Sequence, residues 1–297
     1  MKAFSFGTHI EFKNILFATD FSPPAGGAAR FAAKLAKQYD AKLYAFHVRP
    51  TVVNPMAQPT SWRGLEEAAK TEDEQNRKEI ANTFAGIQPE ILIREGNFWS
   101  NLEAALEEND VDLIVIGTRG RSGIKKLVLG STAEEIFRRV SCPVLTVGPN
   151  TSAPGPRAGE GSRILFATDF SPESYAAVPY AVSLAEECHA CLTLLHVIED
   201  PKVGELVHST ELLNSSDHLL RKLMPPESEL WCVPEYLVEQ GLAADKILEV
   251  AARCRAELIV LGVRQPSGFP GAATHLPIAT AHKIVSRAAC PVLTVRG

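Results

Sequence analysis

The sequence predicts two tandem α/β domains, each with a parallel sheet of five strands flanked by helices. The main observation is a duplication within the 297 residues: the segment ILFATDFSP at residues 15–23 returns at 164–172, and CPVLTV at 142–147 returns at 290–295. Offsets of 149 and 148 residues are the size of a whole domain, whereas solenoid units repeat every ~20–50 residues. A second observation is that apolar runs alternate with helical patterns in each copy, which favours βαβ crossovers and a parallel sheet.

In the first copy, each element has its own local signal. Residues 14–19 form a continuous apolar run, typical of a strand covered on both faces. Residues 25–39 are rich in alanine, with apolar positions at helical spacing. The other expected elements are strands at 42–48, 90–94, 112–117 and 143–147, helices at 62–84, 100–108 and 131–140, and a proline-containing loop at 51–61. Ser100 is the expected N-cap of the helix at 100–108.

A linker separates the copies, because residues 151–162 are rich in glycine, proline, alanine and serine. The second copy then repeats the order, with strands at 163–168, 192–197, 235–238, 258–261 and 291–295 and helices near 175–188, 206–223, 243–254 and 280–287. We therefore expect a first domain at residues 1–150 and a second at 163–297.

Composition restricts the class of protein. Apolar residues make up 45% and charged residues 22%, as in globular domains, and the net charge of -5 argues mildly against nucleic-acid or anionic-membrane partners. Residues 1–12 carry no secretion signal, and no apolar run approaches the length of a membrane span. The six cysteines are scattered, several of them inside apolar runs. These features predict a protein of the reducing cytoplasm.

A glycine-rich loop follows the fourth strand of the first copy. Gly117 ends that strand, Gly120 follows, and Gly130 and Ser131 open the next helix, with Thr132 beside them. Ligands of parallel sheets bind beyond the carboxyl ends of the strands. Glycines and a helix N-terminus expose backbone N–H groups there. Additional basic side chains are Arg119, Arg121, Lys125 and Lys126. The pattern indicates a phosphate-binding loop, with a flexible turn and an ordinary N-cap as the alternative.

Two further strand ends belong to the same sheet edge. Asp20 follows the first strand, where its carboxylate could accept hydrogen bonds from ribose hydroxyls or an adenine amino group; its alternative role is to cap the next helix. Val48 ends the second strand, where its backbone could contact an adenine edge; from the sequence alone it is equally a core valine.

Together these residues resemble the universal stress protein family, and specifically its ATP-binding subgroup. The resemblance rests on Asp20, Val48 and the spacing Gly117-x2-Gly120-x9-Gly130-Ser131, and it covers nearly the whole chain as two tandem domains. It implies a Rossmann-like, adenine nucleotide α-hydrolase-like fold with ATP at the strand ends. Asp20 and Val48 would then contact adenosine. The residues expected at the phosphates are Gly117, Arg119, Gly120, Gly130, Ser131 and Thr132.

The second copy departs from this pattern in its loop. Gly262 matches Gly117, but Gln265 stands at the Gly120 position, and Ile278 and Ala279 replace Gly130 and Ser131. The loop is also three residues longer and includes Phe269 and Pro270, and Pro277 removes a donor. Because side chains and a proline replace the donors, we expect one ATP per chain, bound by the first domain. The second domain would be empty or would bind a neutral or apolar ligand.

Other motifs favour structural roles. The segment Cys188-His189-Ala190-Cys191 lies at a helix-to-strand junction, and no second pair of ligands completes a zinc site. His47 and His196 occupy matching positions in the second strand of each copy, where we expect them to be packed and hydrogen-bonded rather than catalytic.

The leading hypothesis is a regulatory ATP-binding protein with no catalytic residue and no protein metal ligands. Mg²⁺ would be bound through the phosphates, and slow hydrolysis stays open. A nucleotidyl transferase or ATP pyrophosphatase would carry an HxGH or SGGxDS-like motif, and neither occurs. A phosphoacceptor domain using Asp20 would need an acidic pair and a nearby lysine. An interaction scaffold or a binder of a non-nucleotide ligand fits the second domain better than the first.

The expected assembly is an intramolecular pseudo-dimer of the two domains, with a homodimer and an unknown protein partner left open. The segments 143–147 and 291–295 are short, apolar and last in each sheet. Edge strands of this kind leave backbone groups that need a partner. Pairing the two segments would supply one.

Overall fold

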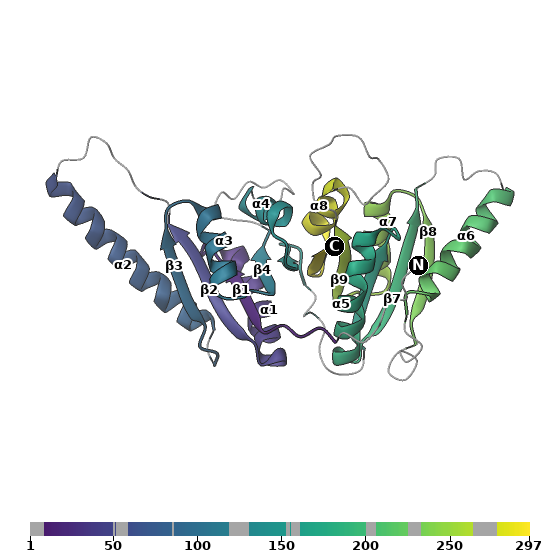
Figure 1. Cartoon of the computed structure of the whole chain (residues 1–297), viewed down its shortest axis with the longest axis horizontal. Helices are drawn as coiled ribbons and strands as arrows, with labels where there is room; N and C mark the ends of the chain where they lie inside the picture. Colours follow the sequence, from purple (N-terminus) through teal and green to yellow (C-terminus); the bar gives the residue numbers. More distant parts are fainter. Residues whose placement is uncertain are drawn as a thin grey trace. The chain divides into compact units, whose positions relative to one another are not determined.

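The computed structural model describes residues 9–49, 51, 59–84, 86–118, 131–152, 155, 161–199, 206–224, 233–263 and 278–297 (Figure 1). The chain divides into two compact units, an N-terminal unit of Phe12–Gly123 and a C-terminal unit that joins Met1–Glu11 to Ile124–Gly297. None of the described helices has the length and apolar character needed to cross a membrane. The two units are considered one at a time.

The N-terminal unit is a parallel sheet with helices between its strands. The strands lie in the order β3-β2-β1-β4, and every neighbouring pair is parallel. In chain order the elements are β1 (Asn14–Ala18), α1 (Pro23–Tyr39), β2 (Lys42–Arg49), α2 (Pro59–Thr83), β3 (Glu90–Glu95), α3 (Phe98–Glu108) and β4 (Leu113–Gly117). The central strands β1 and β4 are buried, whereas β3 is only half-buried. The continuous apolar run that predicts β1 therefore belongs to the middle of the sheet.

The C-terminal unit contains the corresponding sheet of the second copy. Five parallel strands lie in the order β10-β9-β6-β7-β8. The elements are α4 (Ser131–Arg139), β5 (Val144–Val147), β6 (Arg163–Thr168), α5 (Pro172–Cys188), β7 (Cys191–Ile198), α6 (Leu206–Arg221), β8 (Glu235–Gln240), α7 (Ala243–Arg253), β9 (Leu258–Val263), α8 (Ile278–Arg287) and β10 (Val292–Arg296). Every residue of β9 is buried, as expected for a strand covered on both faces.

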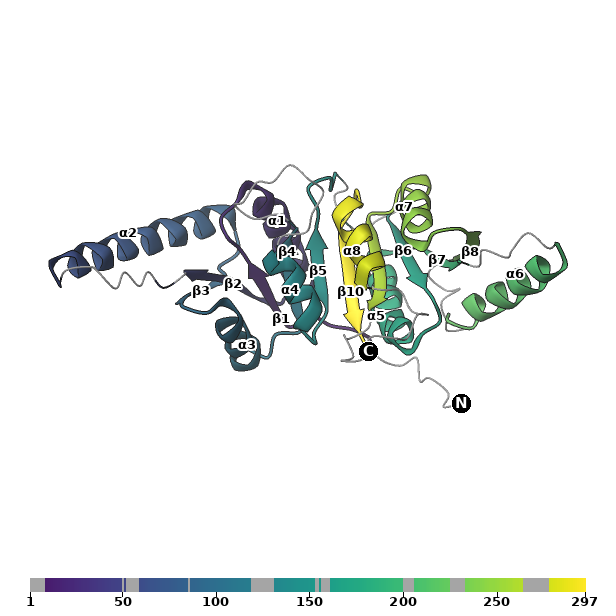
Figure 2. The same cartoon turned by 90° about the horizontal axis from the view of Figure 1, so that it is seen from above.

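The last strands of the two copies are neighbours within the C-terminal unit. β5 and β10 pair antiparallel, with Leu145 opposite Leu293, and they run side by side in Figure 2. Thr294 Oγ1 adds a hydrogen bond to the carbonyl oxygen of Val144 at 3.2 Å. The pairing supplies ladder partners to backbone groups that an edge strand would leave open.

The helix ends show how local sequence sets the element boundaries. Ser22 and Ser171 are the N-caps of α1 and α5, each followed by proline in the first turn, where a missing N–H costs nothing. The prediction that Ser100 caps the helix of residues 100–108 is wrong. The helix begins at Phe98, and Asn97 is its N-cap, accepting a hydrogen bond from the Ser100 N–H at 3.0 Å. Asparagine is among the strongest N-cap residues, which explains the earlier start.

Candidate functional site

Three of the predicted site residues come together at the carboxyl edge of the N-terminal sheet. Ala18 at the end of β1 lies opposite Phe46 of β2 and Ile116 of β4. Asp20, Val48 and Thr118 each follow these residues by two positions, so they form a row of strand ends at the carboxyl edge of the sheet. Gly117 is the last residue of β4. The order β2-β1-β4 therefore makes Asp20 the middle member of this row.

The other residues that were predicted to contact the phosphates lie either outside the described residues or in the C-terminal unit. Arg119, Gly120 and Gly130 lie outside the described residues, as do Arg121, Lys125 and Lys126. Ser131 is the first residue of α4, and Thr132 is exposed in the first turn of the same helix. Both belong to the C-terminal unit, whereas Asp20, Val48 and Gly117 belong to the N-terminal unit.

Asp20 forms the turn that leads from β1 into α1. Its Oδ1 accepts a hydrogen bond from the Ser22 N–H at 3.1 Å, and the Thr19 hydroxyl oxygen accepts one from the Phe21 N–H at 3.0 Å. Phe21 adopts the left-handed conformation at φ 59°, which is uncommon for a residue with a bulky side chain. The aspartate therefore holds the turn before the helix, whereas the N-cap of α1 is Ser22 and not Asp20.

The second copy builds the same turn from the same residue types. Asp169 Oδ1 accepts hydrogen bonds from the Ser171 N–H at 3.0 Å and from the Ser174 hydroxyl at 2.5 Å. Phe170 repeats the left-handed conformation at φ 60°. Because the turn recurs where the glycine loop is lost from the sequence, its geometry does not depend on that loop.

A histidine closes each turn from the neighbouring strand. His47 Nδ1 lies 2.8 Å from the Thr19 carbonyl oxygen, and His196 Nδ1 lies 2.9 Å from that of Thr168. A carbonyl oxygen can only accept, so Nδ1 carries the proton. The His47 ring also packs edge-on against Phe21, with ring centroids 4.7 Å apart. The prediction that both histidines are packed and hydrogen-bonded is confirmed. Burial lowers the pKa of His196 below its ordinary value, which favours the neutral ring.

In the second copy, close packing explains why a glycine, Gly262, stands near the end of the fourth strand. A Cβ built on Gly262 would lie 2.3 Å from the Glu173 carbonyl oxygen and 2.4 Å from the Ser174 Cα. The first turn of α5 therefore approaches β9 so closely that no side chain fits. Gly117 is the aligned residue of the first copy, where α1 packs on β4. The sequence analysis assigned Gly117 to phosphate contact and did not identify the packing role that Gly262 has in the second copy.

Thr118 has a feature of a ligand contact that the sequence analysis did not identify. Its side chain is 2% exposed, and its Oγ1 has no hydrogen-bond partner among the described residues. A buried hydroxyl without a partner costs about 1–3 kcal/mol. Thr118 directly follows Gly117 at the edge where Asp20 and Val48 end their strands. The only sequence signal for it was its place one residue after the strand.

The cysteine-histidine segment forms the junction between α5 and β7. Cys188 is buried at the helix end, and Cys191 begins the strand. His189 is the C-cap of α5 in the left-handed conformation at φ 47°, with its N–H directed to the carbonyl oxygens of Ala185 and Glu186. Across the described ranges, no three histidine, cysteine, aspartate or glutamate side chains gather as metal ligands would.

Comparison with known proteins explains the duplicated architecture. A family model described as the universal stress protein family matches residues 11–148 and, separately, residues 161–296. The chain belongs to the universal stress protein family. The predicted fold class, two tandem α/β domains of Rossmann-like architecture with mostly parallel sheets, is confirmed.

Individual relatives match one or both copies of this universal stress protein. A universal stress protein of Methanocaldococcus jannaschii is 33% identical over 141 residues, which are 46% of this chain and 82% of the relative. One from Mycolicibacterium smegmatis is 28% identical over 297 residues, with 95% of this chain and 96% of the relative covered. The crystal structure of a universal stress protein from Archaeoglobus fulgidus has a TM-score of 0.66 at 20% identity, and covers 96% of this chain and 97% of its own. That likeness supports the tandem fold.

In the second copy of this universal stress protein, the strand ends are described but the loop is not. Asp169 and Gly262 occupy positions matching Asp20 and Gly117. Gln265, Phe269, Pro270 and Pro277 lie outside the described residues. Ile278 begins α8, and Ala279 is exposed in its first turn.

Proposed function

We propose that this universal stress protein is a regulatory ATP-binding protein of the cytoplasm, and that the first copy binds the nucleotide. Asp20 and Val48 would contact adenosine. The phosphates would contact Gly117, Arg119, Gly120, Gly130, Ser131 and Thr132. The carrying observation is the row of Asp20, Val48 and Thr118 at one sheet edge, with the Thr118 hydroxyl buried and without a partner among the described residues.

The residues present fit a nucleotide at this edge. The Asp20 carboxylate already accepts one backbone hydrogen bond through Oδ1, and an ionised carboxylate has acceptor positions for several more. The Thr118 hydroxyl can donate to a ligand oxygen, which would remove the cost of its burial. The bound ATP would supply a triphosphate for the loop donors, and this chain's own part is to bind and orient it. Mg²⁺, where present, would be held through the phosphates.

We propose binding without efficient catalysis. Nδ1 of His47 is directed to a backbone carbonyl oxygen, and Asp20 is engaged in the turn before α1. The His47 ring is also 8% exposed and packs against Phe21, so we do not expect it to be the base that must lie within hydrogen-bonding reach of an attacking water. Turnover should stay well below the ~10 per second of a typical enzyme. Multiple turnover above ~1 per second would refute this part of the proposal.

Calorimetric titration of the full chain with ATP tests the site. We expect about one ATP per chain, no binding by Gly130→Val, and binding weakened about tenfold by Thr118→Val, which removes one buried hydrogen bond at nearly constant volume. Thr146→Val is the matched control, because Thr146 is also buried with an Oγ1 that has no partner among the described residues, but it lies on β5. Unchanged affinity in Gly130→Val with an intact circular dichroism spectrum would refute the site.

An interaction role for the second copy is the other candidate. The large apolar side chains that are exposed in the described part of the chain all belong to this copy: Leu212, Leu219, Val233 and Leu242. Leu212 and Leu219 both lie on α6, and a contiguous apolar patch on that helix would favour contact with another molecule. A homodimer would then also be expected, and sedimentation of the chain before and after Leu212→Glu and Leu219→Glu would measure it. The pseudo-dimer of the two domains stays a prediction.

A further inference from the structure

The N-terminal unit contains a cavity between α1 and α2 with a volume of about 180 Å³. Its floor is the β1 side chain Phe17, which packs edge-on against Phe84 with ring centroids 5.5 Å apart. Ile80 of α2, Ala25 and Ala29 of α1, and Phe21 of the turn before α1 are the other apolar lining residues. All of these side chains are buried except Phe21, which is half-buried. An apolar cavity of about 150 Å³ is large enough to hold benzene.

The rim of the cavity is polar and carries a negative charge. Thr19, Ser22 and Thr83 contribute hydroxyl groups, and Glu79 is the charged residue of the lining. Both Glu79 and Thr83 are exposed on α2, so the charge lies at the solvent end of an apolar hollow. A carboxylate in that place favours a ligand whose apolar body enters the cavity while a cationic group stays at the rim.

Gly26 on α1 keeps the cavity open without a packing reason. It lines the cavity, and a Cβ built on it meets no atom within 4 Å. Glycine inside a helix costs about 1 kcal/mol relative to alanine. Gly262 shows the contrasting case, where a Cβ would lie 2.3 Å from a backbone oxygen. Because Gly26 has no side chain, it leaves space that no described residue of the unit fills.

The second copy carries larger residues at the matching positions. The repeated segment aligns Gly26 with Tyr175 and Ala29 with Val178. Ile80 near the end of α2 and Phe84 just after it are buried, and they align with Leu220 at the end of α6 and Met224 just after that helix. Thr83 then aligns with Leu223. Leu223 is 3% exposed, whereas Thr83 is exposed, and Glu79 aligns with Leu219. The first copy therefore has smaller side chains than the second at three of these positions and a charged side chain at a fourth.

The geometry points to a second ligand site in the first copy, the α1–α2 cavity, for a small monocyclic aromatic compound with a protonated amine. The volume admits one ring, Phe17 and Phe84 present aromatic surfaces, and Glu79 pairs with the cation at the rim. Tyr175, which aligns with Gly26 in the second copy, carries one aromatic ring of the size that the cavity admits. The lining includes neither Val48 nor the residues of the glycine loop, but Thr19, Phe21 and Ser22 adjoin Asp20, so the cavity is a neighbour of the proposed ATP site and the two are tested separately.

Benzylamine is the probe, and the ¹³C-labelled δ-methyl group of Ile80 in the full chain is the reporter. We expect saturable shifts at Ile80 with a dissociation constant of about 1 mM or below, and no shift at Ile284, which is buried on α8. Gly26→Tyr and Thr83→Leu, which install the residues of the second copy, should each weaken binding about tenfold or more by filling the cavity. Lys37→Tyr is the control, since it adds the same ring to an exposed position of α1.

Benzyl alcohol tests the charge, because it has the same shape without the amine. Glu79→Gln should weaken benzylamine about threefold and leave benzyl alcohol unchanged, as expected for a partly exposed ion pair. Absence of saturable binding by the unmodified chain would overturn the site. Retention of full benzylamine affinity by both Gly26→Tyr and Thr83→Leu would overturn it as well. Equal binding of the two probes would overturn the assignment of a cationic ligand. ATP titration of the same variants keeps these outcomes separate from the nucleotide proposal.

Discussion

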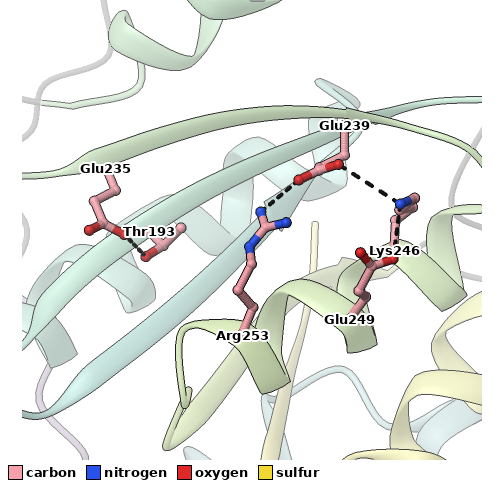
Figure 3. A network of polar contacts seen from close by, with 6 residues as sticks. All are labelled: Thr193, Glu235, Glu239, Lys246, Glu249 and Arg253. Carbon is pink, nitrogen blue, oxygen red and sulfur yellow. Dashed lines mark hydrogen bonds and ion pairs between the residues drawn. The ribbon is translucent and has the colours of Figure 1, made fainter.

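The two copies hold the same ion pair with the charges exchanged. In the first copy Arg94 of β3 pairs with Glu108 of α3. In the second copy, 145 residues further along, Glu239 of β8 pairs with Arg253 of α7 at 2.6 Å. Figure 3 shows this second pair joining its strand to its helix. Both copies therefore have an ion pair at the same position between strand and helix, with the positive and the negative residue exchanged. The contact at this position requires opposite charges on the strand and the helix, whichever of the two carries the positive one.

The surroundings of the pair differ between the copies. In the second copy Lys246 lies between two carboxylates, 2.9 Å from Glu249 and 4.0 Å from Glu239 (Figure 3). In the first copy the residue aligned with Lys246 is Asn101, whose carbonyl oxygen accepts a hydrogen bond from Arg94 at 3.5 Å. The second copy therefore holds its strand and helix together with a charge network, and the first with one ion pair and a backbone contact.

The largest expected effect comes from the glycine at the end of the fourth strand. Gly262→Ala should destabilise the chain by about 3 kcal/mol, because the new Cβ would overlap the backbone of α5. Gly26→Ala is the matched control and should stabilise by about 0.5–1 kcal/mol, since open space surrounds that position. Urea unfolding measures both. A loss below about 1 kcal/mol in Gly262→Ala would mean that α5 moves away easily, and the packing role would be wrong.

A smaller difference is expected at the first helix of each copy. Ser171 caps α5 by accepting a hydrogen bond from the Ser174 N–H at 3.2 Å, whereas the Ser22 side chain makes no such cap bond in α1. Ser171→Ala should therefore cost about 1 kcal/mol, the usual value for a lost N-cap, and Ser22→Ala should cost less. Thermal unfolding of the two variants compares them. Equal losses would show that the cap is not the source of the difference.

Exchange of charges in the first copy tests the ion-pair comparison directly. Arg94→Glu and Glu108→Arg should each destabilise by about 0.5 kcal/mol, and the double variant, which has the polarity of the second copy, should recover most of the loss. The effect is small because the Glu108 side chain is 58% exposed, and added salt should reduce it. A double-mutant cycle with no coupling energy would contradict the shared role of the two pairs.

The smallest expected effect is a change in pH dependence. Burial lowers the pKa of His196 in the folded chain, so below about pH 6.5 the unfolded state binds more protons than the folded state. Stability should be complete above that pH and should fall as the pH drops from the unfolded pKa toward the folded one. His196→Gln should flatten this slope in urea titrations between about pH 5 and pH 7. An unchanged slope would show that other groups cause it.

The sheet edge that carries the candidate site could be located from the sequence because strand ends are local signals. The end of an apolar run places Asp20, and the known direction of parallel strands places Asp20, Val48 and Gly117 at one edge. What could not be predicted depends on which surfaces meet. The buried hydroxyl of Thr118 and the close approach at Gly262 follow from the distance between a helix and a strand, and no pattern along the chain encodes that distance.

The sequence by itself determined the duplication, the alternation of strands and helices, and membership of the universal stress protein family. These depend on periodicity and on matching residue types, which are properties of the chain. The predicted pairing of the two last strands is confirmed by the β5–β10 ladder, but only the tertiary structure decided its register, with Leu145 opposite Leu293. It also decided that Asn97 rather than Ser100 caps α3 and that a cavity lies beside Gly26. The physical reason is that capping, strand pairing and cavity volume depend on atoms brought together from distant or competing segments, and folding chooses among these by packing and hydrogen bonding.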